Sequence, residues 1–171
     1  MKRVLLFITI VAPIVALLAF GLTRNPRDLP STMVGKRAPD FLVETLDGKK
    51  VSFSSFVGKP IVLNFWATWC GPCFYEHAAL REARKLYEKS GVQFLGIVYQ
   101  DQKDSVAAFI KEEGEPFKVL FDPQSQGAIA YGVGGVPETF FIDAKGIIRN
   151  KFDGVLTSEY LQMQIENLQQ K

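Results

Sequence analysis

Two cysteines separated by two residues form the part of this sequence best suited to chemistry. Cys70 and Cys73 enclose Gly71-Pro72, and they lie between an apolar run at 61–66 and a segment of helical periodicity at 71–90. The unpaired amides and dipole of a helix N-terminus favour an anion, so Cys70 should ionise more readily than a free cysteine, whose pKa is about 8.5. We therefore expect Cys70 to be the nucleophile of thiol:disulfide exchange and Cys73 to be the more sheltered resolving thiol.

Other uses of the cysteine pair fit the sequence less well. A disulfide that closes so short a loop contributes little to stability. A structural zinc site needs four ligands, and this chain has two cysteines and one histidine. Copper binding by Cys70, Cys73 and His77 stays an alternative, because His77 follows Cys73 by four positions on the same helical face. A thiol peroxidase needs P-x-x-x-T-x-x-C, whereas Leu63 and Ala67 occupy the proline and threonine positions.

A second motif, residues 134–139, comes directly before an apolar run that ends at Asp143. It reads Gly-Gly-Val-Pro-Glu-Thr, with the proline at position 137. Proline is allowed at the start of a strand, because its missing donor is not yet needed by the ladder. Taken alone, such a motif is most often a simple turn.

The segments around both motifs alternate between strand-like and helix-like patterns. Asp47-Gly48 between alternating apolar segments predicts an early β-hairpin. The runs at 61–66 and 92–99 predict buried strands. The order as a whole predicts an α/β fold with a mixed central sheet flanked by helices. The remaining expected elements are helices at 71–90 and 104–114, the latter starting at Asp104 or Ser105, a short strand at 117–122, a helical turn near 124–131, strands at 138–143 and 147–152, and a final helix from Ser158.

The N-terminal segment, residues 4–22, is apolar throughout. A helix of this length would reach roughly 28 Å, close to the ~30 Å of hydrocarbon in a bilayer. Lys2 and Arg3 precede it, as in both signal peptides and uncleaved anchors. Its length favours a single membrane-spanning anchor. The alternatives are a cleaved leader, with Ala19 and Gly21 as its small residues, and a buried core helix.

The anchor divides the chain into four parts. Residues 1–3 would be a cytoplasmic N-terminus, and 4–22 the membrane helix. Residues 23–36 contain two prolines and several turn formers, which is typical of a linker. The globular domain would then occupy 37–171, on the far side of the membrane.

Composition and charge exclude several classes of protein. With 47% hydrophobic and 22% charged residues, the chain can bury a core, which excludes disorder and collagen-like structure. Four of the 20 basic and one of the 18 acidic residues fall within 1–30, so the rest carries 16 basic and 17 acidic residues. These charges are interspersed and form no basic face, which argues against nucleic acid as a partner.

Both motifs together resemble the thioredoxin superfamily, in which a C-x-x-C loop faces a cis-proline loop. A narrower similarity is to the membrane-anchored cytochrome c maturation thioredoxins called CcmG or DsbE, and it covers nearly all of residues 37–160. The stretches that carry it are NFWATWCGPCFYEHAAL, GIVYQDQKDSVAAFIKEEGEPF and YGVGGVPETFFID. The resemblance implies a thioredoxin-like fold with an added N-terminal β-hairpin, a redox-active Cys70–Cys73 pair and a cis Val136–Pro137 bond.

The resemblance also assigns roles to the neighbours of the dithiol. Trp69 matches the aromatic residue before the pair, and Pro72 belongs to the Gly-Pro dipeptide of general thioredoxins. The backbone at Val136 would pair with an extended segment of the partner protein, beside the cis-proline Pro137.

Two acidic residues, Glu76 and Glu138, match positions that mark this branch of the superfamily. Beside the dithiol, their negative charge would raise the pKa values of the cysteines and oppose the helix dipole. The alternative is that both are ordinary solvated carboxylates. Thioredoxin itself has a buried aspartate six positions before its first cysteine, where this chain has Asn64. We therefore expect Glu76 or Glu138 to replace that proton acceptor.

This resemblance implies a bacterial reductant of protein disulfides, held in the inner membrane by its N-terminal helix with the catalytic domain in the periplasm. The implied partners are apocytochrome c, whose haem-site cysteines must be dithiols, and a membrane electron donor of the CcdA or DsbD kind. No cofactor and no metal are expected. The alternatives are a general reductant of the TlpA or ResA kind, an oxidant, and a copper carrier that uses His77.

Overall fold

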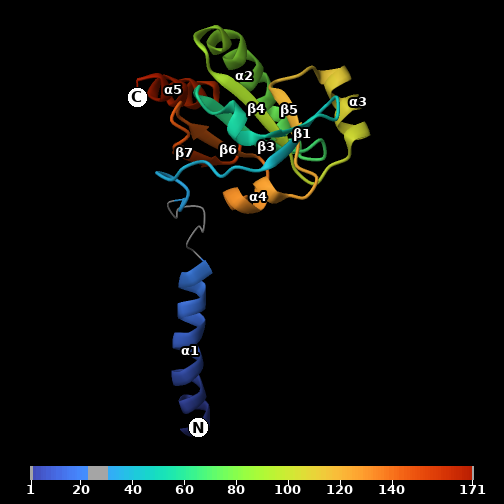
Figure 1. Cartoon of the computed structure of the whole chain (residues 1–171). Helices are drawn as coiled ribbons and strands as arrows, with labels where there is room; N and C mark the ends of the chain where they lie inside the picture. The colour runs from blue at the N-terminus through green and yellow to red at the C-terminus, as the bar shows by residue number, and fades with distance from the viewer. Residues whose placement is uncertain (1, 23–30, 171) are drawn as a thin grey trace. The chain divides into compact units, whose positions relative to one another are not determined.

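The computed structural model describes residues 2–22 and 31–170, and it separates into one unit up to residue 30 and a second from Ser31 onward. The first unit contains the helix α1 (Lys2–Leu22), with Pro13 inside it (Figure 1). Over the part of the chain that the structure describes, no helix is both long enough and apolar enough to cross a membrane. Residues 23–30 of the predicted linker, and Met1, lie outside the described residues.

The second unit alternates strands and helices, in close agreement with the expected order. Its elements are β1 (Leu42–Thr45), β2 (Lys50–Ser52), the 3-10 helix η2 (Phe53–Phe56), β3 (Ile61–Trp66), α2 (Gly71–Tyr87), the 3-10 helix η3 (Glu88–Ser90), β4 (Gln93–Val98), α3 (Lys103–Glu113), β5 (Lys118–Phe121), α4 (Gln126–Tyr131), β6 (Glu138–Ile142), β7 (Ile148–Asp153) and α5 (Ser158–Gln169).

The strands form one mixed seven-stranded sheet in the order β2-β1-β5-β4-β3-β6-β7. The central strand β3 pairs parallel with β4 and antiparallel with β6. Phe65, near the end of β3, lies opposite Glu138, at the start of β6. The loop that follows β3 and the loop that precedes β6 therefore meet at the same end of the sheet, the carboxyl end of β3. These two loops carry the two sequence motifs.

Helices cover both faces of this sheet, as predicted. Leu80 of α2 and Leu161 of α5 belong to the apolar cluster on one face, and Tyr131 of α4 belongs to the cluster on the other face (Figure 1). Every residue of β3 is buried, because the strand is covered on both sides. The packing is close at Gly96, where an added Cβ would lie 2.1 Å from the Phe117 ring. The core thus fixes β3 and α2, the elements that flank the cysteines.

On the lateral edge of the sheet opposite to β7, β1 and β2 pair antiparallel around the Asp47–Gly48 turn, and β1 joins the sheet through β5. The globular domain, expected to start at residue 37, begins earlier than predicted. Gly35 N–H donates to the Ile148 carbonyl at 2.8 Å, and Ile148 N–H donates to the Lys36 carbonyl at 2.9 Å. The last residues of the predicted linker are therefore attached to β7 by backbone hydrogen bonds, which their turn-rich composition did not reveal.

Candidate active site

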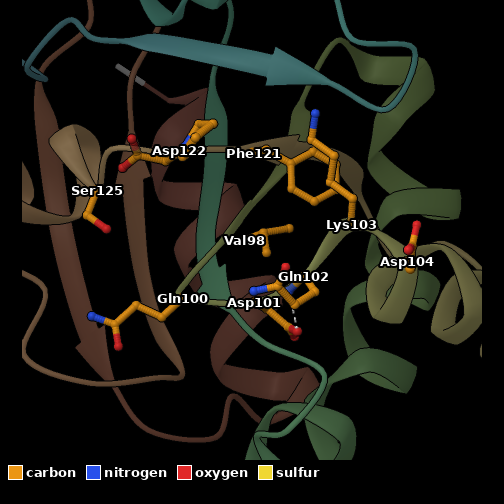
Figure 2. A pocket seen from close by; sticks show the side chains of 10 residues that line it. Val98, Gln100, Asp101, Gln102, Lys103, Asp104, Phe121, Asp122 and Ser125 are labelled. Atoms are coloured by element: carbon orange, nitrogen blue, oxygen red, sulfur yellow. Dashed lines mark hydrogen bonds between the residues drawn. The ribbon is translucent and has the colours of Figure 1, made fainter.

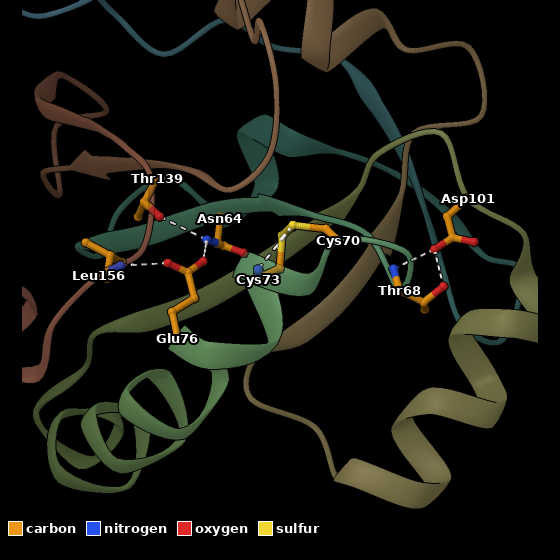
Figure 3. The surroundings of a disulfide bond; sticks show 8 residues. All are labelled: Asn64, Thr68, Cys70, Cys73, Glu76, Asp101, Thr139 and Leu156. Atoms are coloured by element: carbon orange, nitrogen blue, oxygen red, sulfur yellow. Dashed lines mark hydrogen bonds between the residues drawn. A yellow bond between two sulfur atoms is a disulfide. The ribbon is translucent and has the colours of Figure 1, made fainter. Parts of the chain in front are cut away.

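The two cysteines form a disulfide at the N-terminus of α2 (Figure 3). Cys70 is the N-cap residue, and its Sγ accepts a hydrogen bond from the Cys73 N–H at 3.1 Å. Cys70 is 4% exposed and Cys73 is fully buried. The order of exposure is the expected one, although little of Cys70 is open in the disulfide form. The sulfur of Cys70 occupies the position where a helix N-terminus stabilises a thiolate.

Exposed aromatic side chains flank the two cysteines in the sequence. Trp69 is 58% exposed, and its indole N–H donates to the Gln100 carbonyl at 3.2 Å. Pro72, Phe74 and Tyr75 are exposed as well. The sequence analysis did not single out Phe74 and Tyr75, although their helical phase places them away from the buried face of α2. Exposed aromatic groups beside a reactive sulfur give a partner protein apolar contact area.

The cis-proline loop is present as the resemblance implied. The Val136–Pro137 bond is cis. The loop is fixed by Glu138, whose Oε1 accepts hydrogen bonds from Gly134 N–H at 2.9 Å and Gly135 N–H at 3.2 Å. The pairing of β3 with β6 places this loop at the end of the sheet where β3 finishes and the C-x-x-C loop begins.

Glu138 is not an ordinary solvated carboxylate, because it is buried, and it lies on the face of the sheet opposite to Asn64. It lies opposite Phe65 in the β3–β6 pair, whereas the neighbouring pair, Asn64 and Thr139, faces the other side of the sheet. Its Oε2 is 3.0 Å from the Lys151 ammonium group. Glu138 is thus a buried side chain that holds the cis-proline loop from the face remote from Asn64.

Glu76 occupies the place beside Asn64, as one of the two alternatives predicted. Its Oε1 accepts from the Asn64 Nδ2 at 2.7 Å, and its Oε2 accepts from the Leu156 N–H at 2.9 Å (Figure 3). Burial raises the pKa of Glu76 from 4.5 to about 7, although the hydrogen bonds from Leu156 and Asn64 act in the opposite direction. Glu76 follows Cys73 by three positions and so shares its face of α2.

A further contact fixes the loop before Cys70, and the sequence analysis missed it. Asp101 Oδ2 accepts hydrogen bonds from the Thr68 N–H and hydroxyl, each at 2.6 Å (Figure 3). Because β3 and β4 are parallel neighbours, the residues that follow the two strands meet at their common carboxyl end. A carboxylate just after the second buried strand was the signal that could have revealed this contact.

A surface cavity of about 650 Å³ adjoins Asp101, between the ends of β4 and β5 and the start of α3 (Figure 2). Gln100 and Ser125 both line it and both have positive φ, 47° and 53°, which is uncommon for residues other than glycine. The cavity wall and the loop before Cys70 are therefore joined through Asp101 and Gln100.

His77 packs in an aromatic environment instead of joining the cysteines. Its ring centroid is 5.1 Å from that of Trp66, 5.5 Å from Phe109 and 5.4 Å from Phe117. Burial, with a smaller contribution from Arg81, lowers its pKa to about 4. Within the described ranges 2–22 and 31–170, no group of three or more His, Cys, Asp or Glu side chains could hold a metal ion.

Comparison with known proteins gives consistent results. The AhpC/TSA family matches residues 34–151. The thiol:disulfide interchange protein DsbE of Vibrio cholerae is 38% identical, with 100% of this chain and 96% of the relative covered. The thiol-disulfide oxidoreductase ResA of Geobacillus thermodenitrificans is 36% identical over 79% of this chain and 78% of its own. A crystal structure of a thioredoxin family thiol:disulfide interchange protein from Chlorobium tepidum has a TM-score of 0.68 and 29% identity, covering 78% of this chain and 96% of the other.

The mixed sheet, the dithiol at a helix N-terminus and the adjacent cis-proline loop together define a thioredoxin-fold oxidoreductase. The chain belongs to the AhpC/TSA family and, within it, to the thiol:disulfide interchange proteins related to DsbE. Leu63 and Ala67 still occupy the positions where a peroxidase motif needs proline and threonine. Family membership therefore defines the fold and the exchange chemistry without implying peroxide reduction.

Proposed function

We propose that this chain reduces disulfides of extracytoplasmic proteins, and above all keeps the haem-site cysteines of apocytochrome c as dithiols. The buried carboxyl group of Glu76, one helical turn after Cys73, carries the argument for the direction of transfer. With a pKa of about 7, it is partly charged at neutral pH. Negative charge beside the pair disfavours the thiolate and so favours the disulfide over the reduced form. A protein whose disulfide is favoured donates electrons to its partners.

The reaction needs no bound cofactor, because the dithiol itself supplies two electrons. The Cys70 thiolate attacks one sulfur of the partner disulfide, so the partner S–S bond breaks, a mixed disulfide forms and a partner thiolate leaves and takes up a proton. Cys73 then loses its proton and attacks the sulfur of Cys70. The second partner thiol is released, and the Cys70–Cys73 disulfide remains.

The surroundings of the pair suit an extended protein segment as substrate. The cis-proline loop lies at the same end of the sheet as the C-x-x-C loop. The Val136 backbone can therefore pair with an extended segment of the partner, as an added strand would. Trp69, Phe74 and Tyr75 offer exposed aromatic surface around the same point. The partner apocytochrome c is taken from the resemblance of the sequence to the cytochrome c maturation thioredoxins, and the similarity to DsbE over the full chain agrees with that resemblance.

The direction of electron transfer is tested by the reduction potential of the Cys70–Cys73 pair in glutathione buffers. We expect a value closer to that of thioredoxin, about −270 mV, than to that of the oxidant DsbA, about −120 mV. A potential near the DsbA value would overturn the assignment as a reductant.

The substrate is tested by trapping with Cys73→Ala, which prevents the resolving step and leaves the partner bound to Cys70. The double variant Cys70→Ala/Cys73→Ala is the control. We expect mass spectrometry to identify apocytochrome c among the adducts of the single variant only. A broad set of adducts without apocytochrome c would instead support a general reductant, the second candidate, which the similarity to ResA favours.

The location and the electron donor belong to the same proposal. The membrane anchor at 4–22, with its N-terminus in the cytoplasm and the catalytic domain in the periplasm, rests on the apolar sequence of that segment alone, since none of the described helices qualifies as a membrane span. A donor of the CcdA or DsbD kind in that membrane would restore the dithiol. Fractionation of the full chain should recover it with the inner membrane, and protease added to spheroplasts should digest the domain from Ser31 onward. Recovery in the cytosol would contradict the proposal.

A further inference from the structure

Asn64 is a buried polar residue beside the redox pair whose hydrogen-bonding capacity is only half used. It is fully buried in the middle of β3. Its Nδ2 donates to Glu76 Oε1 at 2.7 Å and to the Thr139 hydroxyl at 2.9 Å. Among the described residues, its Oδ1 has no hydrogen-bond partner. A buried acceptor without a donor destabilises the state in which it occurs.

The placement of Asn64 brings this oxygen toward Cys73. Cys73 and Glu76 are three residues apart on one face of α2, which separates their Cβ atoms by roughly 5–6 Å. Asn64 contacts Glu76 from the strand beneath that face, and its donor group is fully occupied there. Figure 3 shows the Asn64 oxygen on the side turned to Cys73, away from Thr139.

Cys73 changes its hydrogen-bonding character with redox state. In the disulfide, its sulfur carries no hydrogen and can donate nothing. Reduction takes up two electrons and two protons per disulfide, and it gives Cys73 an S–H group, which is a weak donor. Because Cys73 is fully buried, that donor needs an acceptor inside the protein.

We propose that Asn64 Oδ1 accepts a hydrogen bond from the S–H group of reduced Cys73, a bond that exists in the dithiol form and is absent from the disulfide form. Asn64 then stabilises the reduced protein, in opposition to the effect of the Glu76 carboxylate. The amide takes no proton from Cys73, so the proton still leaves for another acceptor when Cys73 attacks the mixed disulfide. The inference rests on exchange at the pair itself and is independent of which protein is the substrate.

The first test is the dithiol–disulfide equilibrium of Asn64→Leu against glutathione. Loss of the hydrogen bond should favour the disulfide about tenfold, which corresponds to about 30 mV toward a more negative potential. Because Asn64→Leu also removes a partner of Glu76, the comparison is repeated in the Glu76→Leu background, where the side chain at position 76 exchanges no hydrogen bond with the Asn64 amide and the same shift is expected. No shift in that background would show that Asn64 acts only through Glu76 and would overturn the proposal.

The second test observes the bond directly and keeps Asn64 intact. Cys70→Ser leaves Cys73 as the only thiol, so the infrared S–H stretching band of this protein belongs to Cys73 alone. We expect a band shifted to lower frequency than that of a thiol in an apolar solvent, and we expect Asn64→Leu to remove the shift. Thr139→Val is the matched control, because it removes another contact of Asn64 and should leave the band in place. An unshifted band in Cys70→Ser would show that the Cys73 S–H group makes no hydrogen bond and would overturn the proposal.

Discussion

Replacing Glu76 by Gln should change how the stability of the oxidised protein depends on pH. The pKa of Glu76 is raised from 4.5 to about 7 in the folded protein, mainly by burial. One pKa unit corresponds to 1.36 kcal/mol, so the ionised group lowers the free energy of unfolding by about 3 kcal/mol. The folded state binds this proton more tightly than the unfolded state. The contribution is therefore fully present below pH 4.5 and is lost as the pH rises through about 7.

The Gln side chain cannot ionise, and its oxygen can still accept from the Leu156 N–H. Urea unfolding of the wild type and of Glu76→Gln, with the disulfide intact, is measured between about pH 4.5 and 8.5. We expect the stability of the variant relative to the wild type to rise by about 3 kcal/mol across this range, and to level off above about pH 7.5. The titration of His77 is common to both proteins and cancels in the difference.

Glu82→Gln is the control, because Glu82 is exposed on the same helix and its replacement also removes one negative charge. A difference between wild type and Glu76→Gln that does not change with pH would refute the reasoning. It would mean that the carboxyl group is ionised at the same pH in the folded and unfolded chains.

Three further substitutions give separate expectations. His77→Leu should raise the free energy of unfolding by about 1 kcal/mol, because both ring nitrogens are buried without a hydrogen-bond partner among the described residues. Gly96→Ala should lower it by about 3 kcal/mol, because the new Cβ would overlap the Phe117 ring. Asp101→Asn should lower it by about 1–2 kcal/mol and slow the reduction of insulin disulfides, because the amide cannot keep all the hydrogen bonds that fix Thr68.

Urea unfolding checks the three stabilities, and insulin turbidity checks the rate. Gly71→Ala is the control for Gly96, since its Cβ would meet no atom within 4 Å. Asp104→Asn is the control for Asp101, because it removes an exposed carboxylate from the same cavity wall. A destabilised His77→Leu, a tolerated Gly96→Ala, or an Asp101→Asn protein that behaves like Asp104→Asn would each contradict the corresponding argument.

The parts of the fold that could be predicted are those with strong local patterns. The apolar run at 61–66 predicted β3, because a strand buried on both faces is apolar at nearly every position. The helical period after Cys70 predicted α2, because a helix buried on one face repeats its apolar residues every three to four positions. The N-terminus of α3 was less predictable. Asp104 and Ser105 looked like N-caps, but the helix starts after Gln102, whose side chain makes no capping bond.

The parts of the site that could not be predicted depend on long-range pairing. The face on which Glu138 lies is set by its pairing with Phe65, and a shift of one residue would have turned it toward Asn64. The contact of Asp101 with Thr68 likewise requires knowing that β3 and β4 are neighbours. The proline motif suggested a cis bond only through resemblance, since its local sequence is also that of a common turn.

The separation of Glu76 and Glu138 by the central sheet has a consequence for how this protein can vary. Among the residues that the structure describes, the two carboxylates share no hydrogen-bond or ion-pair partner. Substitutions at sites that share no partner usually have additive effects. Substitutions at Glu76 and at Glu138 should therefore change stability nearly independently, so the surroundings of the sulfurs and the support of the cis-proline loop can be altered separately.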